Sequence, residues 1–137
     1  MEYEVTDQDL ALISAATEAI RKGYKPGWHT VGAALRSEDG QIFASIHIDA
    51  NVGRIAVCAE PIALANAIMA GKTRFDTIVA VGRKKSVEKD LQFEVVSPCG
   101  MCREIVTDYD PRTKVIIRTE EGLKKTLMSD LLPFKYK

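Results

Sequence analysis

Two short segments, 58–60 and 98–102, carry every cysteine of the chain. Cys99 and Cys102 form a C-x₂-C pair, a spacing typical of zinc-binding thiolates, and Cys58 can supply a third sulfur. Three protein ligands leave one position of a tetrahedral zinc ion open to water, which is the pattern of a catalytic site. The sequence therefore predicts a Zn²⁺ site held by Cys58, Cys99 and Cys102.

Glu60 follows the first of these cysteines by two residues. Hydrolytic removal of an amino group needs a carboxylate that takes a proton from the attacking water and passes protons to the ring nitrogen and the leaving amine. Taken singly, Cys58 would be a small core residue and Glu60 a first-turn carboxylate favoured by the helix dipole. Their occurrence together with the C-x₂-C pair favours a site in which Glu60 is the catalytic residue.

The charge of such a site needs compensation, because three thiolates around a 2+ ion leave a net charge of −1. Helix N-termini favour anionic thiolates, and both ligand segments open predicted helices. Arg103 directly follows Cys102 and is expected to donate a hydrogen bond to a ligand sulfur.

Three predicted helices surround these motifs. Thr6 is a suitable N-cap for the first, whose apolar residues recur at helical spacing, and Gly23 a suitable end. Pro61 is tolerated only in a first turn, so the second helix is predicted to begin at about residues 58–60. The predicted helices span residues 6–22, 58–70 and 98–109.

Strand-like runs alternate with these helices, which favours an α/β fold with a mixed sheet. The turn at Ser37-Glu-Asp-Gly40 joins the first two runs as a hairpin. Residues 83–90 are predicted to form a charged surface loop, and the chain from 127 onward a short strand and a helical turn. The predicted strands are 30–35, 41–48, 77–82, 93–97 and 114–118, all within a single domain, 1–137.

Composition narrows the possible partners. The chain has 137 residues, with 19 Lys plus Arg and 19 Asp plus Glu, so its formal net charge is zero. It therefore lacks the positive charge that would favour binding to a nucleic acid polymer. No apolar run approaches the roughly 20 residues of a membrane-spanning helix, and the acidic start lacks the features of a secretory signal. We therefore expect a cytoplasmic protein with reduced thiols and a small-molecule substrate.

Several motifs resemble those of the cytidine deaminase superfamily, nearest to the free-nucleoside cytidine deaminases and the blasticidin S deaminases. The resemblance implies a three-layer α/β/α fold with a mixed five-stranded sheet, a zinc cofactor and Glu60 as proton shuttle. It also implies a homotetramer, or a homodimer, whose active sites border subunit interfaces. The motifs are Val31-Gly-Ala-Ala-Leu35, the Asp39-Gly40 turn, Cys58-Ala-Glu60, Ser97-Pro-Cys-Gly-Met-Cys-Arg103 and Leu131-Leu-Pro133.

The same resemblance assigns roles to further residues. The backbone of Ala59 and Ser97 would bind the pyrimidine edge, and Phe134 or Tyr136 from the C-terminal tail would cover the site of a neighbouring subunit.

Some positions depart from the family pattern. His29 stands where the family usually has a Phe. His47 and Asp49 stand where the family usually has the Asn and the Glu that bind ribose. Asp49 is able to accept a hydrogen bond from a hydroxyl and His47 to donate one. Pro61 replaces the usual Arg, and Glu104 the usual Gln. These departures favour a blasticidin S deaminase or a deaminase of free bases or related heterocycles.

Trp28, Arg54 and the two histidines each have two interpretations. In the first, the residue lines the mouth of the pocket and selects the substrate. In the second, its role is structural only: Trp28 packs on the sheet, Arg54 is a solvated loop charge, and the histidines are surface or hydrogen-bonded structural residues.

The predicted function is a zinc-dependent hydrolytic deaminase. It converts a cytosine-type aminopyrimidine, in cytidine, deoxycytidine or blasticidin S, into the uracil-type product and ammonia. One alternative is a structural zinc module with His29 or His47 as fourth ligand. Another is a thiol oxidoreductase that uses Cys99 and Cys102.

Overall fold

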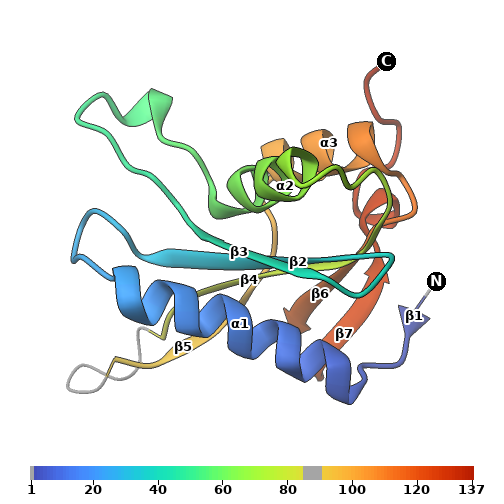
Figure 1. Ribbon diagram of the computed structural model, residues 1–137, viewed down its shortest axis with the longest axis horizontal. Helices are drawn as coiled ribbons and strands as arrows, with labels where there is room; N and C mark the ends of the chain where they lie inside the picture. Colours follow the sequence, from blue (N-terminus) through green and yellow to red (C-terminus); the bar gives the residue numbers. More distant parts are fainter. Residues whose placement is uncertain (1, 85–90) are drawn as a thin grey trace.

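The computed structural model describes residues 2–84 and 91–137 (Figure 1). Residues 85–90 of the predicted charged loop lie outside the described residues. The helices are α1 (Asp7–Gly23), α2 (Ala59–Met69) and α3 (Gly100–Tyr109), with short 3₁₀ turns η1 (Gly53–Ile55) and η2 (Met128–Leu131). The strands are β1 (Glu2–Tyr3), β2 (Val31–Ser37), β3 (Ile42–Ile46), β4 (Phe75–Arg83), β5 (Phe93–Val96), β6 (Lys114–Thr119) and β7 (Gly122–Leu127).

All the described strands join one mixed sheet in the order β1-β7-β6-β4-β2-β3, with β5 paired to β4. The β4–β6 pair is parallel, whereas the other pairs are antiparallel. Helix α1 covers one face of the sheet, and α2 and α3 cover the other (Figure 1). The predicted three-layer α/β/α fold is confirmed.

The predicted number of strands was five, whereas the sheet formed by the described residues has seven. The added strands are β1, which is only two residues long, and β7, whose sequence Gly-Leu-Lys-Lys-Thr-Leu lacks clear apolar alternation. Lys125 lies in β7 yet is buried, because its ammonium group is paired with the carboxylate of Asp9 at 2.8 Å. A paired lysine can thus occupy a position that sequence patterns assign to solvent.

Helix α1 begins as predicted, with a reciprocal capping box. The backbone N–H of Asp9 donates to Thr6 Oγ1 at 3.2 Å, and the N–H of Thr6 donates to Asp9 Oδ2 at 2.9 Å. Its buried face packs against Gly32 of β2, where a Cβ atom would lie 2.4 Å from the carbonyl oxygen of Ala16. Glycine at this position allows the close approach of helix and sheet.

An ion network with a buried centre joins α1 to four strands, β2, β4, β6 and β7. Asp9 accepts from Arg36 at 2.8 Å as well as from Lys125, and Arg36 also pairs with Asp76 at 3.0 Å. Lys114 contacts the other oxygen of Asp76 at 3.2 Å. Charges buried in this way are tolerated because each has an opposite partner.

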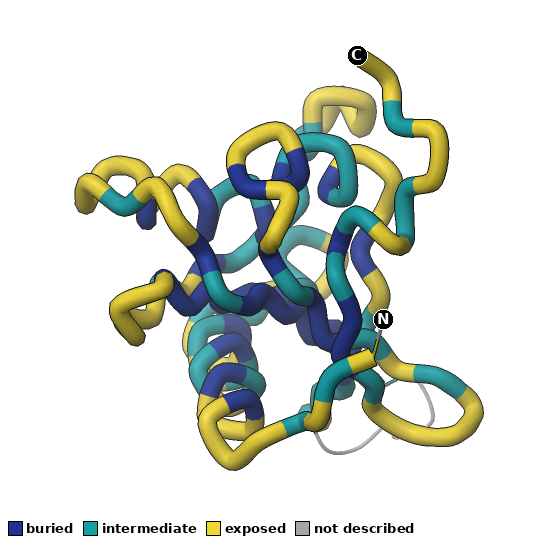
Figure 2. Tube along the Cα trace, turned by 90° about the vertical axis from the view of Figure 1, so that its right-hand side faces the viewer, coloured by how far each residue is buried: buried dark blue, intermediate teal, exposed yellow. Residues whose placement is uncertain are grey.

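Two apolar clusters fill the spaces on either side of the sheet, one under α1 and one under α2 and α3. Buried segments therefore run through the centre of the molecule, whereas the C-terminal tail is mostly exposed (Figure 2). Of the helices that the structure describes, none has the length and apolar character needed to cross a membrane.

Candidate active site

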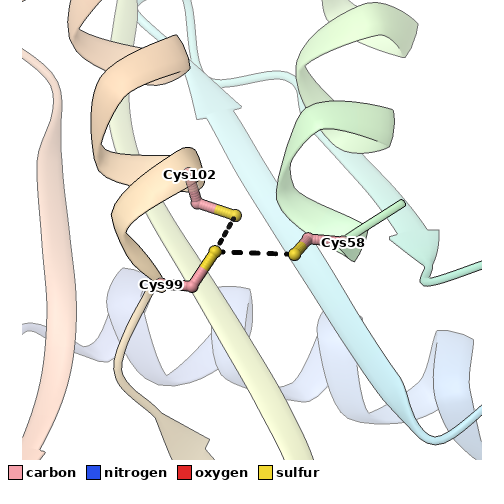
Figure 3. A group of neighbouring side chains, drawn as sticks. All are labelled: Cys58, Cys99 and Cys102. Atoms are coloured by element: carbon pink, nitrogen blue, oxygen red, sulfur yellow. Dashed lines mark hydrogen bonds between the residues drawn. The ribbon is translucent and has the colours of Figure 1, made fainter. Parts of the chain in front are cut away.

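The three cysteines meet at the N-termini of α2 and α3. Cys58 is the N-cap of α2, Cys99 is the N-cap of α3, and Cys102 lies in the first turn of α3. Figure 3 shows the three sulfurs pointing toward one another from the two helix ends. The unpaired N–H groups at both helix ends favour negative charge on these sulfurs.

The spacing of the sulfurs fits a zinc ion. Cys99 Sγ lies 3.6 Å from Cys58 Sγ and 3.4 Å from Cys102 Sγ, and the three atoms lie within 4.8 Å of one another. Zinc–sulfur bonds of about 2.3 Å at tetrahedral angles place two sulfurs about 3.8 Å apart. A disulfide would bring two sulfurs to about 2.05 Å, and all three cysteines are free. The described residues thus present the donor set that was predicted for Zn²⁺.

The protein environment acts differently on the three thiols. Burial, followed by the carboxylate of Glu60, raises the pKa of Cys102 far above its ordinary range. Burial also raises the pKa of Cys58, whereas hydrogen bonds from the Cys102 and Met101 backbone and from neighbouring thiols outweigh burial and lower the pKa of Cys99. A coordinated cation deprotonates thiols outright. A bound zinc ion would therefore stabilise three adjacent thiolates, which would otherwise repel one another.

Glu60 lies in the first turn of α2 and is only 5% exposed. Burial raises the pKa of its carboxyl group, and hydrogen bonds from its own backbone N–H and from Cys102 only partly offset that effect. A carboxyl group with a raised pKa exchanges protons more readily near neutral pH than an exposed glutamate does.

A pocket of about 220 Å³ opens beside these groups. It brings together six of the residues that were predicted from the sequence: Cys58, Cys99, Glu60, Ala59, Ser97 and His47. Sequence reasoning missed its apolar wall, which is formed by Val31, Ala56, Val57 and Val96. Ala56 and Val57 directly precede Cys58, and Val96 directly precedes Ser97. This proximity to the predicted motifs was the sequence signal that could have identified them as pocket residues.

His47 is held in one tautomer. Its Nδ1 accepts hydrogen bonds from the backbone N–H groups of Thr30 at 3.2 Å and Val31 at 3.3 Å, so the ring proton is on Nε2. Burial is the largest effect on the pKa of His47 and lowers it, which favours the neutral ring. His29 donates from Nδ1 to the carbonyl oxygen of His47 at 3.0 Å and thereby supports the same segment.

Arg103 has a different contact from the predicted one. Its Nε donates to the carbonyl oxygen of Pro98 at 3.0 Å, and its Nη1 donates to that of Leu131 at 3.0 Å. The predicted bond to a ligand sulfur is not among these two contacts. Arg103 braces the backbone next to Cys99, because carbonyl oxygens from two segments converge on its guanidinium group.

Other predicted residues lie outside the pocket lining. Trp28 packs edge to face on His29 and contacts Lys25, and Arg54 is exposed in η1. Asp49 accepts a hydrogen bond from the N–H of Ala50 at 2.7 Å. Phe134 and Tyr136 are exposed on the tail.

Comparison with known proteins gives matches over most of the chain. The family described as the cytidine and deoxycytidylate deaminase zinc-binding region matches residues 6–118. A blasticidin-S deaminase of Bacillus cereus is 46% identical over 98% of this chain and 96% of its own length. A cytidine deaminase of Halalkalibacterium halodurans is 31% identical over 89% of each chain.

The fold has the same relatives. The crystal structure of a cytidine deaminase from Burkholderia pseudomallei superimposes with a TM-score of 0.75 at 31% identity, and the match covers 93% of this chain and 98% of that one.

The chain belongs to the family of cytidine and deoxycytidylate deaminase zinc-binding regions. It is a zinc-dependent hydrolytic deaminase of the cytosine type, with relatives among both the cytidine deaminases and the blasticidin S deaminases.

Loss of one sulfur is expected to release the metal. Cys102→Ser replaces a fully buried ligand with a poorer one, and thiolate zinc sites depend on their complete ligand set. We expect zinc measured by elemental analysis to fall from one ion per chain to a small fraction, with deamination lost in parallel. Met101→Ser in the same helical turn is the control and should retain zinc. Full zinc content in Cys102→Ser would contradict this ligand assignment.

Proposed function

We propose that the preferred substrate is blasticidin S, deaminated at its cytosine ring. The support is the 46% identity with a relative named blasticidin-S deaminase, together with the departure from the ribose-binding pattern that the sequence resemblance implies at His47 and Asp49. Cytidine is the second candidate, because relatives named cytidine deaminase match in both sequence and fold.

The proposed reaction replaces the amino group of the ring with oxygen: the substrate and water give the uracil-type product and ammonia. When bound, zinc supplies the Lewis acidity that makes a water molecule nucleophilic near neutral pH. Glu60 takes a proton from that water and passes it to the ring nitrogen beside the attacked carbon. It then transfers the second proton to the departing amine, so that the C–N bond breaks with release of neutral ammonia.

The backbone of Ala59 and Ser97 is proposed to orient the ring. The carbonyl oxygen of Ala59 already accepts a hydrogen bond from Ser45 Oγ at 2.6 Å. Its N–H belongs to the first turn of α2, where backbone donors have no partner within the helix. This N–H is therefore the better candidate to donate to the pyrimidine.

We further propose that residues 1–137 act as a single cytoplasmic domain that assembles into a homotetramer. Large apolar side chains exposed in η1, in the pocket lining and in the first turn of α3 support association, among them Ile55, Val57 and Met101. The unbridged thiols support a reducing compartment. We expect Phe134 or Tyr136 of one subunit to border the site of another.

A substrate panel tests the proposal. Ammonia release is measured with blasticidin S, cytidine, deoxycytidine, cytosine and isocytosine at equal concentrations. The highest kcat/KM is expected for blasticidin S. A higher value for cytidine would favour the second candidate, and preference for cytosine or isocytosine would identify a deaminase of free bases or related heterocycles.

His47 is expected to contribute to KM through its fixed Nε2–H. In His47→Asn the amide oxygen can still accept from Thr30 and Val31, but the donor no longer reaches as far into the pocket. We expect KM for blasticidin S to rise about tenfold, the value of one hydrogen bond of roughly 1.4 kcal/mol, with kcat little changed.

His47→Gln is the matched variant for this prediction. It restores a donor near the position of Nε2 and gives up the backbone acceptor, so it should recover part of the KM and lose thermal stability. An equal rise in KM for unsubstituted cytosine would show that His47 does not contact the group attached to the ring.

A further inference from the structure

The turn between α1 and β2 is closed by its own backbone. The N–H of His29 donates to the carbonyl oxygen of Lys25 at 2.8 Å, and the N–H of Lys25 donates to that of His29 at 2.9 Å. The N–H of Trp28 also donates to the Lys25 carbonyl oxygen, at 2.9 Å. The position of His29 is therefore set by main-chain contacts, which a change of its side chain leaves in place.

This turn lies beside the end of β3, because β2 begins where its antiparallel partner β3 ends (Figure 1). The His47 N–H donates to the carbonyl oxygen of Val31 at 2.9 Å, and His47 Nδ1 accepts from the backbone of Thr30 and Val31. The imidazole of His29 holds the remaining backbone group of His47, its carbonyl oxygen, at 3.0 Å. Three consecutive residues thus hold both the main chain and the ring of His47.

The contacts of His47 leave one of its polar atoms for a ligand. None of them uses Nε2, which carries the ring proton. His47 lines the catalytic pocket together with Ala59 and Glu60. Its Nε2–H is therefore a donor on the pocket wall whose orientation depends on how the rest of the residue is held.

The contact from His29 fixes one end of a peptide group whose other end is also held. The peptide between His47 and Ile48 carries the His47 carbonyl oxygen and the Ile48 N–H. That N–H donates to the carbonyl oxygen of Val57 at 2.9 Å, and Val57 lines the pocket directly before Cys58. Without the bond from His29 this peptide would be held at one end only, so that it and the attached imidazole could reorient.

The ring of His29 acts as a donor as well as a packing group. Its centroid lies 6.3 Å from that of Trp28 and 6.4 Å from that of His47, edge to face in both cases. His29 is half-buried and is not among the residues that line the pocket, which places it to act on a ligand through His47. Phenylalanine would fill a similar space without an N–H, whereas the amide of asparagine would place an N–H near the position of Nδ1.

We propose that His29 is a positioning residue for substrate binding. By holding the carbonyl oxygen of His47, it orients the imidazole so that Nε2–H binds an acceptor oxygen on the group attached to the pyrimidine. The proposal rests on the contact between His47 and the substrate stated under the proposed function, and it names the residue on which the orientation of that contact depends. His29 thereby contributes to the choice of pyrimidine substituent without touching the substrate.

Amide hydrogen exchange followed by NMR tests the holding contact. In His29→Phe we expect the Ile48 N–H to exchange about tenfold faster than in the native chain, because its peptide group is held at one end only. In His29→Asn the exchange rate should return toward the native value. The amide of Ala34, in the centre of β2, is the internal reference and should exchange at the same rate in all three proteins.

A double-mutant cycle with His47→Asn tests whether His29 acts through His47. In the native background, His29→Phe is expected to raise KM for blasticidin S about fivefold, with kcat and zinc content unchanged. In the His47→Asn background the same substitution should change KM by less than about twofold, because the donor that His29 orients is absent. His29→Asn should restore KM. Lys25→Met, at an exposed position of the same turn, is the matched control and should keep the native KM.

Three results would overturn the proposal: unchanged exchange of the Ile48 N–H in His29→Phe, an unchanged KM in that variant, or an equal rise in KM in both backgrounds. If the native chain prefers cytidine to blasticidin S, the cycle is measured with cytidine and decides the role of His29 in the same way. Preference for a free base, or no deamination of any compound in the panel, would instead reject the proposed function, and this role of His29 with it.

Discussion

Glu60→Gln is expected to lower kcat for deamination by a factor of about 10²–10⁴, the usual contribution of a positioned general acid–base group. The amide keeps the size of the side chain but cannot carry a proton between water, ring nitrogen and leaving amine. Glu60 is almost fully buried beside Cys102, so the neutral amide should not disturb the fold. The measurement is ammonia release under single-turnover conditions, with zinc content determined on the same sample.

Zinc content distinguishes two causes of lost activity in Glu60→Gln: loss of the proton carrier and loss of the metal. If Glu60 moves protons without binding the metal, Glu60→Gln should contain one zinc ion per chain and still bind the substrate. Glu120 offers a control, because Glu120→Gln makes the same substitution at an exposed position in the turn between β6 and β7. Near-native kcat in Glu60→Gln would rule out Glu60 as the proton carrier.

Asp9→Asn is expected to destabilise the fold by about 3–5 kcal/mol, the range measured when one partner of a buried ion pair is removed. Asp9 is fully buried and accepts from Arg36 and Lys125 at 2.8 Å each. Asparagine leaves two buried cations with one carboxylate fewer between α1, β2 and β7. Urea unfolding of the zinc-loaded protein measures the change in free energy of unfolding.

Asp7→Asn is the matched control for this prediction. Asp7 is exposed in the same first turn of α1, so the substitution removes only a favourable interaction with the helix dipole, about 0.3–1 kcal/mol. Similar losses in the two variants would show that the buried network contributes little.

The same carboxylate affects stability in acid. Burial opposes ionisation of Asp9, but hydrogen bonds from Lys125, the Thr6 N–H and Arg36 outweigh it and lower its pKa from 3.8 to about 2. Because the folded-state pKa is below the unfolded one, this contribution is complete above pH 3.8 and is lost as pH falls through about 2. It amounts to about 2 kcal/mol. The difference in stability between the native chain and Asp9→Asn should therefore narrow over this interval.

Local signals were sufficient to predict much of the fold. The cap at Thr6 and the first-turn Pro61 placed two helices to within a residue or two, because both features act through the adjacent backbone. Strand β7 was missed because the burial of Lys125 depends on Asp9, which lies far away in the sequence. The local pattern of residues 122–127 therefore could not predict that this segment lies in the sheet.

The metal ligands were predictable for a similar reason. The C-x₂-C spacing and the Cys58–Glu60 spacing are local and have few alternative uses. The contacts of Arg103 with Pro98 and Leu131 and the lining of the pocket by Val96 arise from tertiary packing. Apolar wall residues resemble core residues in sequence, so only the folded chain shows that they face a cavity.

The position of the sulfurs relative to β4 and β5 has a consequence for biosynthesis. Cys58 precedes these two strands and Cys99 follows them. During translation, Cys58 is therefore made before β4 and β5, and its two partner cysteines are made after them. The complete set of three sulfurs exists only once both strands have been synthesised, so we expect stable metal capture to follow their synthesis.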